Sequence, residues 1–339
     1  MARLTIYDIA EKAGVSPSTV SRALQDHPRI GENTKGRIQA LAKEMGYVPS
    51  AVARGLKTKR SRVLGVIVHR IEDPYLTEVL KGIEDTLHSY GYSLFLAATQ
   101  RIPEREQEVI RAMNERRVDG IIISSSHINM KRLRQLDHYG IPSVLINNQE
   151  TLEPDTCSVY NDEIYSMNQI LQHVIGLGHK RIAYLGSPRA GRTNKKRQQG
   201  YEEALREAGV EVCADYISNG VNARPQGGAQ AMRELLALEK LPTAVVCYND
   251  MMAIGAIQAI NQANLCVPDD VSVTGFDNID LAAYVTPPLT TFHQPRYKLG
   301  QQAAEMMLQA LNGEPIPAQT QVSILRGELV IRQSTASPN

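Results

Sequence analysis

The segment from Leu4 to Leu24 constrains this chain more than any other, because it has the pattern of two short helices joined by a tight turn. In LTIYDIAEKAGVSPSTVSRAL the first apolar side chains recur at helical spacing, at Ile6, Ile9, Ala10 and Ala13. Gly14 can end the first helix with a positive φ at little cost. Ser16 is a good N-cap for a second helix, and Pro17 at its first position loses no needed N–H.

On the second helix, Val20 and Leu24 face inward, which leaves polar side chains directed to solvent: Ser18, Ser21, Arg22 and Gln25. A short helix supported by a partner is what a helix-turn-helix inserts into the major groove of DNA. The alternative is an ordinary helical hairpin with a solvated face. Charge favours DNA: residues 1–62 hold twelve Lys and Arg against five acids, a net +7, whereas the remainder has 25 against 31, a net −6.

A third helix is predicted from Glu32 to Met45, which closes a small domain over residues 1–48. Residues 49–61, PSAVARGLKTKRS, follow as a basic connector. The connector is too short to be a stable isolated helix, since helices below about 12–15 residues are marginal in water. Gly55 inside it costs roughly 1 kcal/mol relative to alanine. Two interpretations stay open: a basic flexible linker, or a helix that forms only when something holds it.

From Val63 onward, apolar strands alternate with amphipathic helices. Predicted strands are Val63–Val68, Ser93–Ala97, Gly120–Ser124, Ser143–Ile146, Arg181–Leu185, Thr243–Cys247 and Val271–Gly275. Predicted helices include Leu76–Tyr90, Glu104–Arg117, Asp162–Gly176, Lys196–Ala208 and Asp250–Ala263. Continuous apolar strands alternating with helices predict an α/β fold with parallel sheets covered on both faces. The length of residues 62–339 favours two similar doubly wound lobes rather than one sheet.

Ligands of open parallel sheets bind at the carboxyl ends of the strands, so the residues that follow each strand are candidates for a site. These candidates are His69, Asp73, Tyr75, Ser124, Asp162, Arg197, Asn249, Asp250, Asp277 and Gln294. Carboxylates, amides and an arginine together suit the vicinal hydroxyls of a polyol. Plainer roles exist for three of them: Asp162 and Asp250 as helix N-caps, and Arg197 in a surface ion pair.

The stretch TIYDIAEKAGVSPSTVSRAL, with Tyr47-Val48-Pro49 after it, resembles the N-terminal signature of the lactose-repressor/galactose-repressor family of bacterial transcription regulators. The resemblance extends over essentially the whole chain. It implies an effector cleft between two lobes like those of type I periplasmic sugar-binding proteins. The lobes would span about 62–161 with 293–325, and about 162–292 with 326–339. It also implies a homodimer on a pseudo-palindromic operator, with a sugar or sugar derivative as effector.

The resemblance further implies that the connector is a hinge helix, which docks in the minor groove and inserts Leu56 between base pairs. We expect Pro17, Ser18 and Arg22 to read bases, and Thr19 and Ser21 to contact phosphates. The full set of expected DNA contacts is Thr5, Tyr7, Ser16, Pro17, Ser18, Thr19, Ser21, Arg22, Arg29, Ala53, Leu56 and Lys57. The expected effector contacts are His69, Asp73, Tyr75, Ser124, Asp162, Arg197, Asn249, Asp277 and Gln294, with Asn161 as an alternative to Asp162.

Two departures from the family pattern concern the effector. The family often places an aromatic platform in the loop after Gly220, where this chain has Ala223, so stacking must come from Tyr75, Tyr160 or Phe292 or be absent. A basic run also lies at the predicted cleft: Arg189, Arg192, Lys195, Lys196 and Arg197. It suggests an effector with negative charge, and the alternative is a solvated basic loop. A nucleoside or purine effector, or a corepressor, remains an alternative to a sugar.

Catalysis is not expected. GSPRAGRT at Gly186–Thr193 nearly fits a P-loop, but Arg192 replaces the lysine, and the next helix is predicted to begin only near Lys196. Neither a GxGxxG stretch nor an ordered Ser/His/Asp arrangement is present. Four cysteines without a CxxC pair and scattered histidines predict neither metal nor cofactor: Cys157, Cys213, Cys247 and Cys266.

The expected location is the cytoplasm, since the N-terminal residues MARLTIYDIAEK have no apolar signal region and no apolar run approaches the ~18 residues of a membrane span. A solute-binding protein without gene control is a distant alternative, which leaves the basic N-terminal segment unexplained. No leucine heptads precede Asn339, so we expect a dimer without a helical tetramerisation tail.

Overall fold

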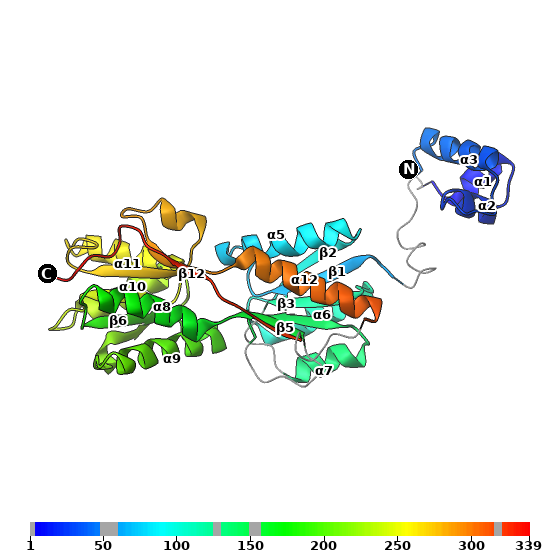
Figure 1. The fold of residues 1–339 in the computed structure, drawn as a ribbon. Helices are drawn as coiled ribbons and strands as arrows, with labels where there is room; N and C mark the ends of the chain where they lie inside the picture. The colour runs from blue at the N-terminus through cyan, green and yellow to red at the C-terminus, as the bar shows by residue number, and fades with distance from the viewer. Residues whose placement is uncertain (1–3, 48–59, 125–129, 149–156, 315–320) are drawn as a thin grey trace. The chain divides into compact units, whose positions relative to one another are not determined.

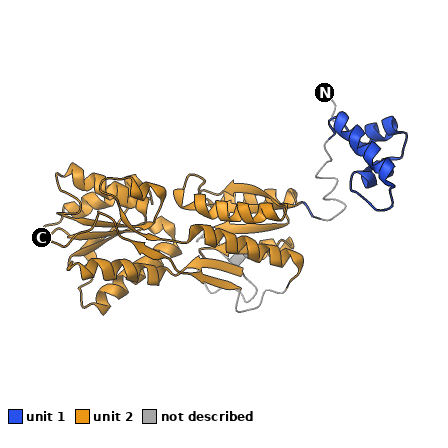
Figure 2. Cartoon of the chain, turned by 45° about the horizontal axis from the view of Figure 1, so that its top comes forward, with its two compact units in different colours: residues 1–61 blue, residues 62–339 orange. Residues whose placement is uncertain are grey.

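The structure, a computed structural model, describes residues 4–47, 60–124, 130–148, 157–314 and 321–339. The chain forms two compact units, residues 1–61 and residues 62–339 (Figure 2). We call them the head and the core. Within the described residues, no helix is long and apolar enough to cross a bilayer.

The head consists of three helices, α1 (Ile6–Ala13), α2 (Pro17–Ala23) and α3 (Glu32–Glu44). Local chemistry sets their ends: Gly14 adopts φ 65° after α1, and the Ser16 side chain accepts a hydrogen bond from Thr19 N at 3.2 Å to cap α2. The helices enclose one small core of buried side chains, formed by Ile9, Ala10, Val20, Ala23, Ile38 and Ala42. The helix-turn-helix pattern and the third helix are confirmed. Leu24 is only half-buried, and Ala23 takes the inward position beside Val20.

The first lobe of the core is a six-stranded parallel sheet in the order β11-β5-β4-β3-β1-β2 (Figure 1). Its strands are β1 (Val63–Val68), β2 (Ser93–Ala98), β3 (Gly120–Ser124), β4 (Ser143–Ile146), β5 (Cys157–Asn161) and β11 (Val322–Leu325). Its helices are α5 (Pro74–Ser89), α6 (Pro103–Glu115), α7 (Met130–His138) and α12 (Arg296–Asn312). Buried side chains of α5 and α12 pack on one face of the sheet, and those of α6 and α7 pack on the other.

The second lobe has a six-stranded sheet in the order β12-β10-β9-β8-β6-β7. Its strands are β6 (Ile182–Gly186), β7 (Ile217–Asn219), β8 (Ala244–Cys247), β9 (Ser272–Asp277), β10 (Thr290–His293) and β12 (Glu328–Val330). Its α-helices are α8 (Glu163–Gly176), α9 (Arg192–Glu207), α10 (Pro225–Leu236) and α11 (Asp250–Gln262). Helices α8 and α9 cover one face, and α10 and α11 cover the other. The sheet is parallel except for edge strand β12, which is antiparallel to β10.

The α/β prediction of two doubly wound lobes is confirmed. The chain passes from one sheet to the other three times: between β5 and α8, between β10 and α12, and between β11 and β12. The largest difference in a predicted element start is at α9, which begins at Arg192, four residues before the predicted Lys196. Gly186–Thr193 therefore lies between a strand and a helix, as a P-loop does, but it contains a turn of 3-10 helix at Pro188–Ala190 and has Arg192 in place of the lysine.

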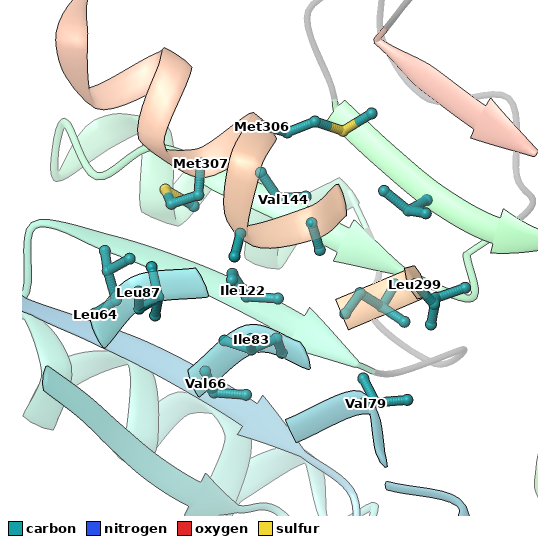
Figure 3. Close-up of a cluster of buried hydrophobic side chains, with 14 of the residues drawn as sticks. Leu64, Val66, Val79, Ile83, Leu87, Ile122, Val144, Leu299, Met306 and Met307 are labelled. Carbon is teal, nitrogen blue, oxygen red and sulfur yellow. The ribbon is translucent and has the colours of Figure 1, made fainter. Parts of the chain in front are cut away.

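The first lobe is held together by close contact between α5 and α12. Figure 3 shows Val79, Ile83 and Leu87 of α5 and Leu299 of α12 with side chains of the strands beneath them. Two glycines allow the helix backbones to touch: a Cβ added at Gly82 would overlap the carbonyl oxygen of Tyr297, and one at Gly300 would overlap that of Val79. This contact fixes α12, which starts directly after the second crossing, against the first sheet.

Candidate functional site

The exposed face of α2 is a candidate DNA-reading surface. Val20 and Ala23 are fully buried, so the helix is fixed with Ser18 and Arg22 exposed to solvent. Ser16 is used as the N-cap, with its oxygen 2.8 Å from Ser18 Oγ. Short polar side chains in the first turn of a helix, followed by an exposed arginine in its last turn, suit base edges and phosphates.

The other predicted DNA contacts of the head lie before, within and after α2 in the sequence. Tyr7 is 68% exposed, and Arg29 is exposed as well. Thr5 caps α1 through a reciprocal pair of contacts with Asp8, with Thr5 N donating to Asp8 Oδ2 at 2.7 Å. Ser21 and Thr19 are half-buried, and so is Pro17. Three of the predicted contacts lie outside the described residues: Ala53, Leu56 and Lys57.

A cavity lies between the lobes of the core, at the carboxyl ends of strands from both sheets. We call it the inner cavity; it is lined by His69, Arg70, Asp73, Tyr75, Leu76, Arg101, Ser124, Asn147, Thr193, Arg197, Ala223, Tyr248, Asn249 and Asp277. Seven of the nine predicted effector contacts are among them, all except Asp162 and Gln294. The topology of parallel sheets explains this convergence, because loops that leave the carboxyl ends of neighbouring strands meet at one edge.

Arg197 is the most deeply held charge of the inner cavity, at 3% exposed. Its Nε donates to Glu163 Oε2 at 2.7 Å, and its Nη1 lies 3.8 Å from Asp277 Oδ1. Burial alone would lower the pKa of Arg197, but the charges of Glu163 and Asp277, with Tyr248, raise it above its ordinary value. The plainer role of Arg197 as a surface ion pair is therefore wrong: the pair is buried, and it keeps the guanidinium charged.

Gln294 is fully buried and acts behind the cavity rather than in its wall. Its Nε2 donates to Asp277 Oδ1 at 2.5 Å, and its Oε1 accepts a hydrogen bond from Asn161 Nδ2. Asn161 ends β5 at the first crossing and Gln294 follows β10 at the second. This chain of hydrogen bonds links two of the three segments that join the lobes to the cavity carboxylate.

Asp73 is the second cavity carboxylate and the N-cap of α5, where its Oδ1 accepts from Tyr75 N at 3.2 Å. Its Oδ2 lies 3.0 Å from His69 Nε2 and 3.4 Å from Arg70 Nη2. Burial alone would raise the pKa of Asp73, but the hydrogen bond from His69 and the charges of His69 and Arg70 lower it below its ordinary value. Asp73 is thus an ionised group whose partners belong to its own lobe.

The two aspartates with plainer alternatives behave differently. Asp162 does not line the cavity; it caps α8 by accepting from Tyr165 N at 3.1 Å, and its Oδ2 accepts from Arg326 Nε at 3.0 Å. Asp250 is not an N-cap, because Asn249 caps α11 and Asp250 is the first helical residue. The Asp250 carboxylate is fully buried and accepts from Thr291 Oγ1 at 2.5 Å.

Aromatic side chains reach the inner cavity from two positions. Tyr75 lines it and accepts a hydrogen bond from Asn147 Nδ2 at 2.8 Å. Tyr248 lines it as well, and burial raises its pKa to about 12, so its hydroxyl stays protonated. Phe292 is not available for stacking, because it is buried with Phe276 in the core of the second lobe. Tyr160 lines neither this cavity nor the neighbouring one.

A second hollow of about 420 Å³ opens next to the inner cavity and shares three lining residues with it. We call it the outer basin; it is lined by Arg70, Gln100, Arg101, Arg189, Asn222 and Ala223.

Sequence reasoning missed Arg101 and Asn147, although the rule that ligands bind at the carboxyl ends of parallel strands could have found them. They follow the carboxyl ends of β2 and β4, two further strands of the first sheet.

In the described parts of the chain, no group of three or more His, Cys, Asp and Glu side chains is placed to hold a metal ion. The cavity carboxylates Asp73 and Asp277 are engaged instead with arginine, histidine and amide partners.

Models of known protein families match residues in both the head and the core. A model described as "Bacterial regulatory proteins, lacI family" matches residues 5–50, and one described as "Periplasmic binding protein-like domain" matches residues 171–335. The HTH-type transcriptional repressor PurR of Mannheimia succiniciproducens is 35% identical, covering 97% of this chain and 98% of the relative. The HTH-type transcriptional repressor CytR of Escherichia coli K12 is 34% identical, covering 98% and 96%.

Solved structures give the same result. The lac repressor dimer bound to operator and the anti-inducer ONPF superposes with a TM-score of 0.87 at 26% identity, covering 99% of this chain and all of that chain. The cellobiose complex of the transcriptional regulator CelR superposes with a TM-score of 0.74 at 28% identity, covering 98% and 100%. The chain therefore belongs to the lacI family of bacterial regulatory proteins and is a DNA-binding transcriptional regulator.

Proposed function

We propose that the chain is a repressor of a carbohydrate-utilisation operon, which binds a pseudo-palindromic operator as a homodimer under the control of a small effector. In this proposal residues 1–48 read DNA, residues 49–61 connect, and residues 62–339 bind the effector and dimerise. The lobes span about 62–161 with 293–325 and about 162–292 with 326–339. One observation carries it: the inner cavity gathers polar side chains from the strand ends of both lobes.

The chemistry of the cavity supports a ligand with several hydroxyl groups. Ser124, Thr193 and Asn249 supply small polar groups, and the Asp277 carboxylate is held in place by Gln294. Asn147 Oδ1 is buried and has no hydrogen-bond partner among the described residues, so it can accept from a ligand hydroxyl. Convergent acceptors and donors of this kind favour a polyol over an apolar ligand.

We further propose that the protein acts in the cytoplasm, without a cofactor and without catalysing a reaction. The inner carboxylates support this role, because each is engaged in a structural contact rather than presented beside a nucleophile: Asp73 caps α5, and Asp277 is bonded to Gln294.

Selection from random duplex DNA with the full-length protein tests the DNA-binding half of the proposal. We expect a pseudo-palindromic site, bound with an affinity that falls as salt rises. Fluorescence anisotropy on that site, repeated with a panel of sugars, sugar derivatives and nucleosides, tests the effector half. If no preferred sequence is selected, the proposed repressor function is contradicted. If nucleosides alone change operator affinity, the proposed carbohydrate effector is contradicted.

Asn147→Gly provides a sharper variant, because Asn147 has a positive φ of 55° that glycine adopts freely. The change removes the unpaired cavity acceptor, so the active ligand should bind about tenfold more weakly while ligand-free operator affinity is unchanged. Asn264→Gly is the matched control, since Asn264 has φ 59°, is exposed and does not line the cavity. Equal ligand affinities of the two variants would remove Asn147 from the binding site.

A further inference from the structure

We propose that the ligand of the cleft carries an anionic group, a phosphate or a carboxylate, which the arginines of the outer basin hold: Arg70, Arg101 and Arg189. This inference rests on the proposed function, because it names the chemical class of that effector. The outer basin shares Arg70, Arg101 and Ala223 with the inner cavity, so one ligand can reach both compartments. Its volume of about 420 Å³ is within the range of small-molecule sites.

The charges of the two compartments are balanced differently. In the inner cavity, Arg197 faces Glu163 and Asp277. The described lining of the outer basin holds three guanidinium groups, two amides and an alanine, with no carboxylate. Asp73 contacts only Arg70 of the three, at 3.4 Å. Arg70 and Arg101 share a partly buried space and repel each other, and an anion bound between them would reduce that repulsion.

Two of the basin arginines have a buried hydrogen-bond donor without an acceptor. Arg101 Nε is buried and has no hydrogen-bond partner in the described parts of the chain, and the same is true of Arg70 Nε. Burial, with the neighbouring charges of Arg70 and Arg189, lowers the pKa of Arg101. A bound phosphate or carboxylate would accept from such donors in charge-assisted, often bidentate, hydrogen bonds.

The backbone that carries Arg101 is itself strained. Gln100 and Arg101 are consecutive non-glycine residues with φ of 52° and 59°, in the turn between β2 and α6. The turn is tied to the end of β1, where Gln100 N donates to His69 O at 2.8 Å. Left-handed conformations of this kind cost free energy in non-glycine residues, and they are frequent at ligand-binding sites. Here they direct Gln100 and Arg101 toward the same basin.

The lining of the outer basin distinguishes the two interpretations of the basic run, which are an anion-binding role and a solvated loop. In the basic run of the sequence, Lys195 is exposed and Lys196 Nζ donates to Gln199 Oε1 at 3.2 Å, so neither lines a cavity. Arg189 alone of the run lines the basin. It meets Arg70 and Arg101 from the other lobe, and nothing in the sequence brings these three together. An anion between them would therefore bridge the lobes.

Isothermal titration calorimetry of the full-length protein with inorganic phosphate, at ionic strength held constant with chloride, tests the basin. Arg101→Gln should weaken phosphate binding roughly ten- to a hundredfold, the loss of charge-assisted hydrogen bonds. Lys195→Gln is the matched control, because it removes one positive charge on α9 outside both cavities, and its affinity should stay within about twofold of the parent. The basic head is the same in all three proteins, so phosphate bound there cancels in the comparison.

Glucose, glucose 6-phosphate and gluconate, titrated next, distinguish the two kinds of anion. We expect one of the charged compounds to bind at least about tenfold more tightly than glucose, and Arg101→Gln to abolish that difference. The thermal midpoint of ligand-free Arg101→Gln should equal or exceed that of the parent, because the change relieves repulsion. A drop in midpoint would make Arg101 a structural residue and overturn the proposal.

Two further results would overturn it: equal phosphate affinities for Arg101→Gln and Lys195→Gln, or glucose binding as tightly as both charged compounds. Operator binding of ligand-free Lys195→Gln, which lies outside both cavities, is measured in parallel and should match the parent. If no operator is found while the phosphate result holds, the proposed gene control fails and the anion site stands. If operator binding is normal and the phosphate result fails, only the anion site falls.

Discussion

At Arg197 the core buries a positive charge that its own carboxylates already balance. Its bond to Glu163 at 2.7 Å and its contact with Asp277 hold the guanidinium in one position before any ligand arrives. Arg101 is the opposite case, since its Nε has no partner in the described chain. The first arrangement pre-orients a binding group, and the second leaves binding energy for the ligand.

Arg22 is the residue at which base reading can be tested. Arg22→Ala should relax preference at one base position of the selected operator by ~1–3 kcal/mol, because a guanidinium pairs with guanine O6 and N7 in two hydrogen bonds. Lys43→Ala removes the same charge from the exposed side of α3. Lys43→Ala should weaken binding to all operator sequences alike. Competition anisotropy on single-base operator variants measures both, and an unchanged base preference in Arg22→Ala refutes the assignment.

Asp250 should make stability depend on pH. Burial raises its pKa to about 7, above the value of about 4 in an unfolded chain. The folded state therefore binds the extra proton between these values, and the free energy of unfolding falls as pH rises from about 4 to about 7. One group can contribute at most ~1.4 kcal/mol per pH unit.

Asp250→Asn removes this titration, so the difference in unfolding free energy between parent and variant should shift against the parent as pH rises from 5 to 7. Above pH 8 the difference should be constant. Urea unfolding at each pH measures it, and the comparison cancels histidines that titrate in both proteins. A difference that does not change with pH means that Asp250 is ionised throughout.

At the residue scale, the sequence predicted the cavity residues that lie at the carboxyl ends of strands. Seven predicted contacts line the inner cavity, because the carboxyl ends of β1, β3, β6, β8 and β9 and the segments that follow them converge there. Asp162 is an exception, since its side chain turns to cap α8 and to meet Arg326. The outer basin could not be predicted from the sequence. Arg70, Arg101 and Arg189 meet only through the packing of the two lobes.

At the scale of elements, the α5–α12 contact is the most exacting packing in the first lobe. Gly300→Ala should destabilise the core by at least ~1–3 kcal/mol, because the new methyl group meets the backbone of Val79 rather than a side chain that can move. Gly176→Ala is the control: it is also helical, and nothing lies within 4 Å of the added Cβ. That change should be neutral or stabilising by up to ~1 kcal/mol. Thermal unfolding compares the two, and similar midpoints would show that the contact can adjust.

The elements that sequence reasoning located are those with a strong apolar period. The predicted bounds of β1, β3 and β4 agree with the structure, because these strands are central and buried on both faces. Strands β7, β11 and β12 have only three or four residues and exposed positions, so their pattern is too weak to detect. The start of α9 was missed because Arg192 and Lys195 occupy its first turn, where basic residues oppose the helix dipole.

For the whole molecule, the arrangement of the core suggests how the cleft can act at a distance. Three segments join the lobes, and Asn161 and Gln294 link two of them to the Asp277 carboxylate at the cavity. Glu72 and Arg224 form a further ion pair between the lobes. A ligand that binds both lobes shifts their equilibrium only by its difference in affinity for the two arrangements. In the proposed function, the connector at residues 49–61 converts that shift into operator affinity.

The central claim is that the connector does more than tether the head, and one replacement tests it. The four basic residues of 49–61 are kept, Arg54, Lys57, Lys59 and Arg60, and all others become Gly or Ser, so charge is unchanged. Anisotropy is then measured on the selected operator and on random duplex DNA of equal length. We predict that operator affinity falls at least about tenfold while affinity for random DNA stays within about twofold. Equal operator affinity of the parent and the replaced chain would contradict the account.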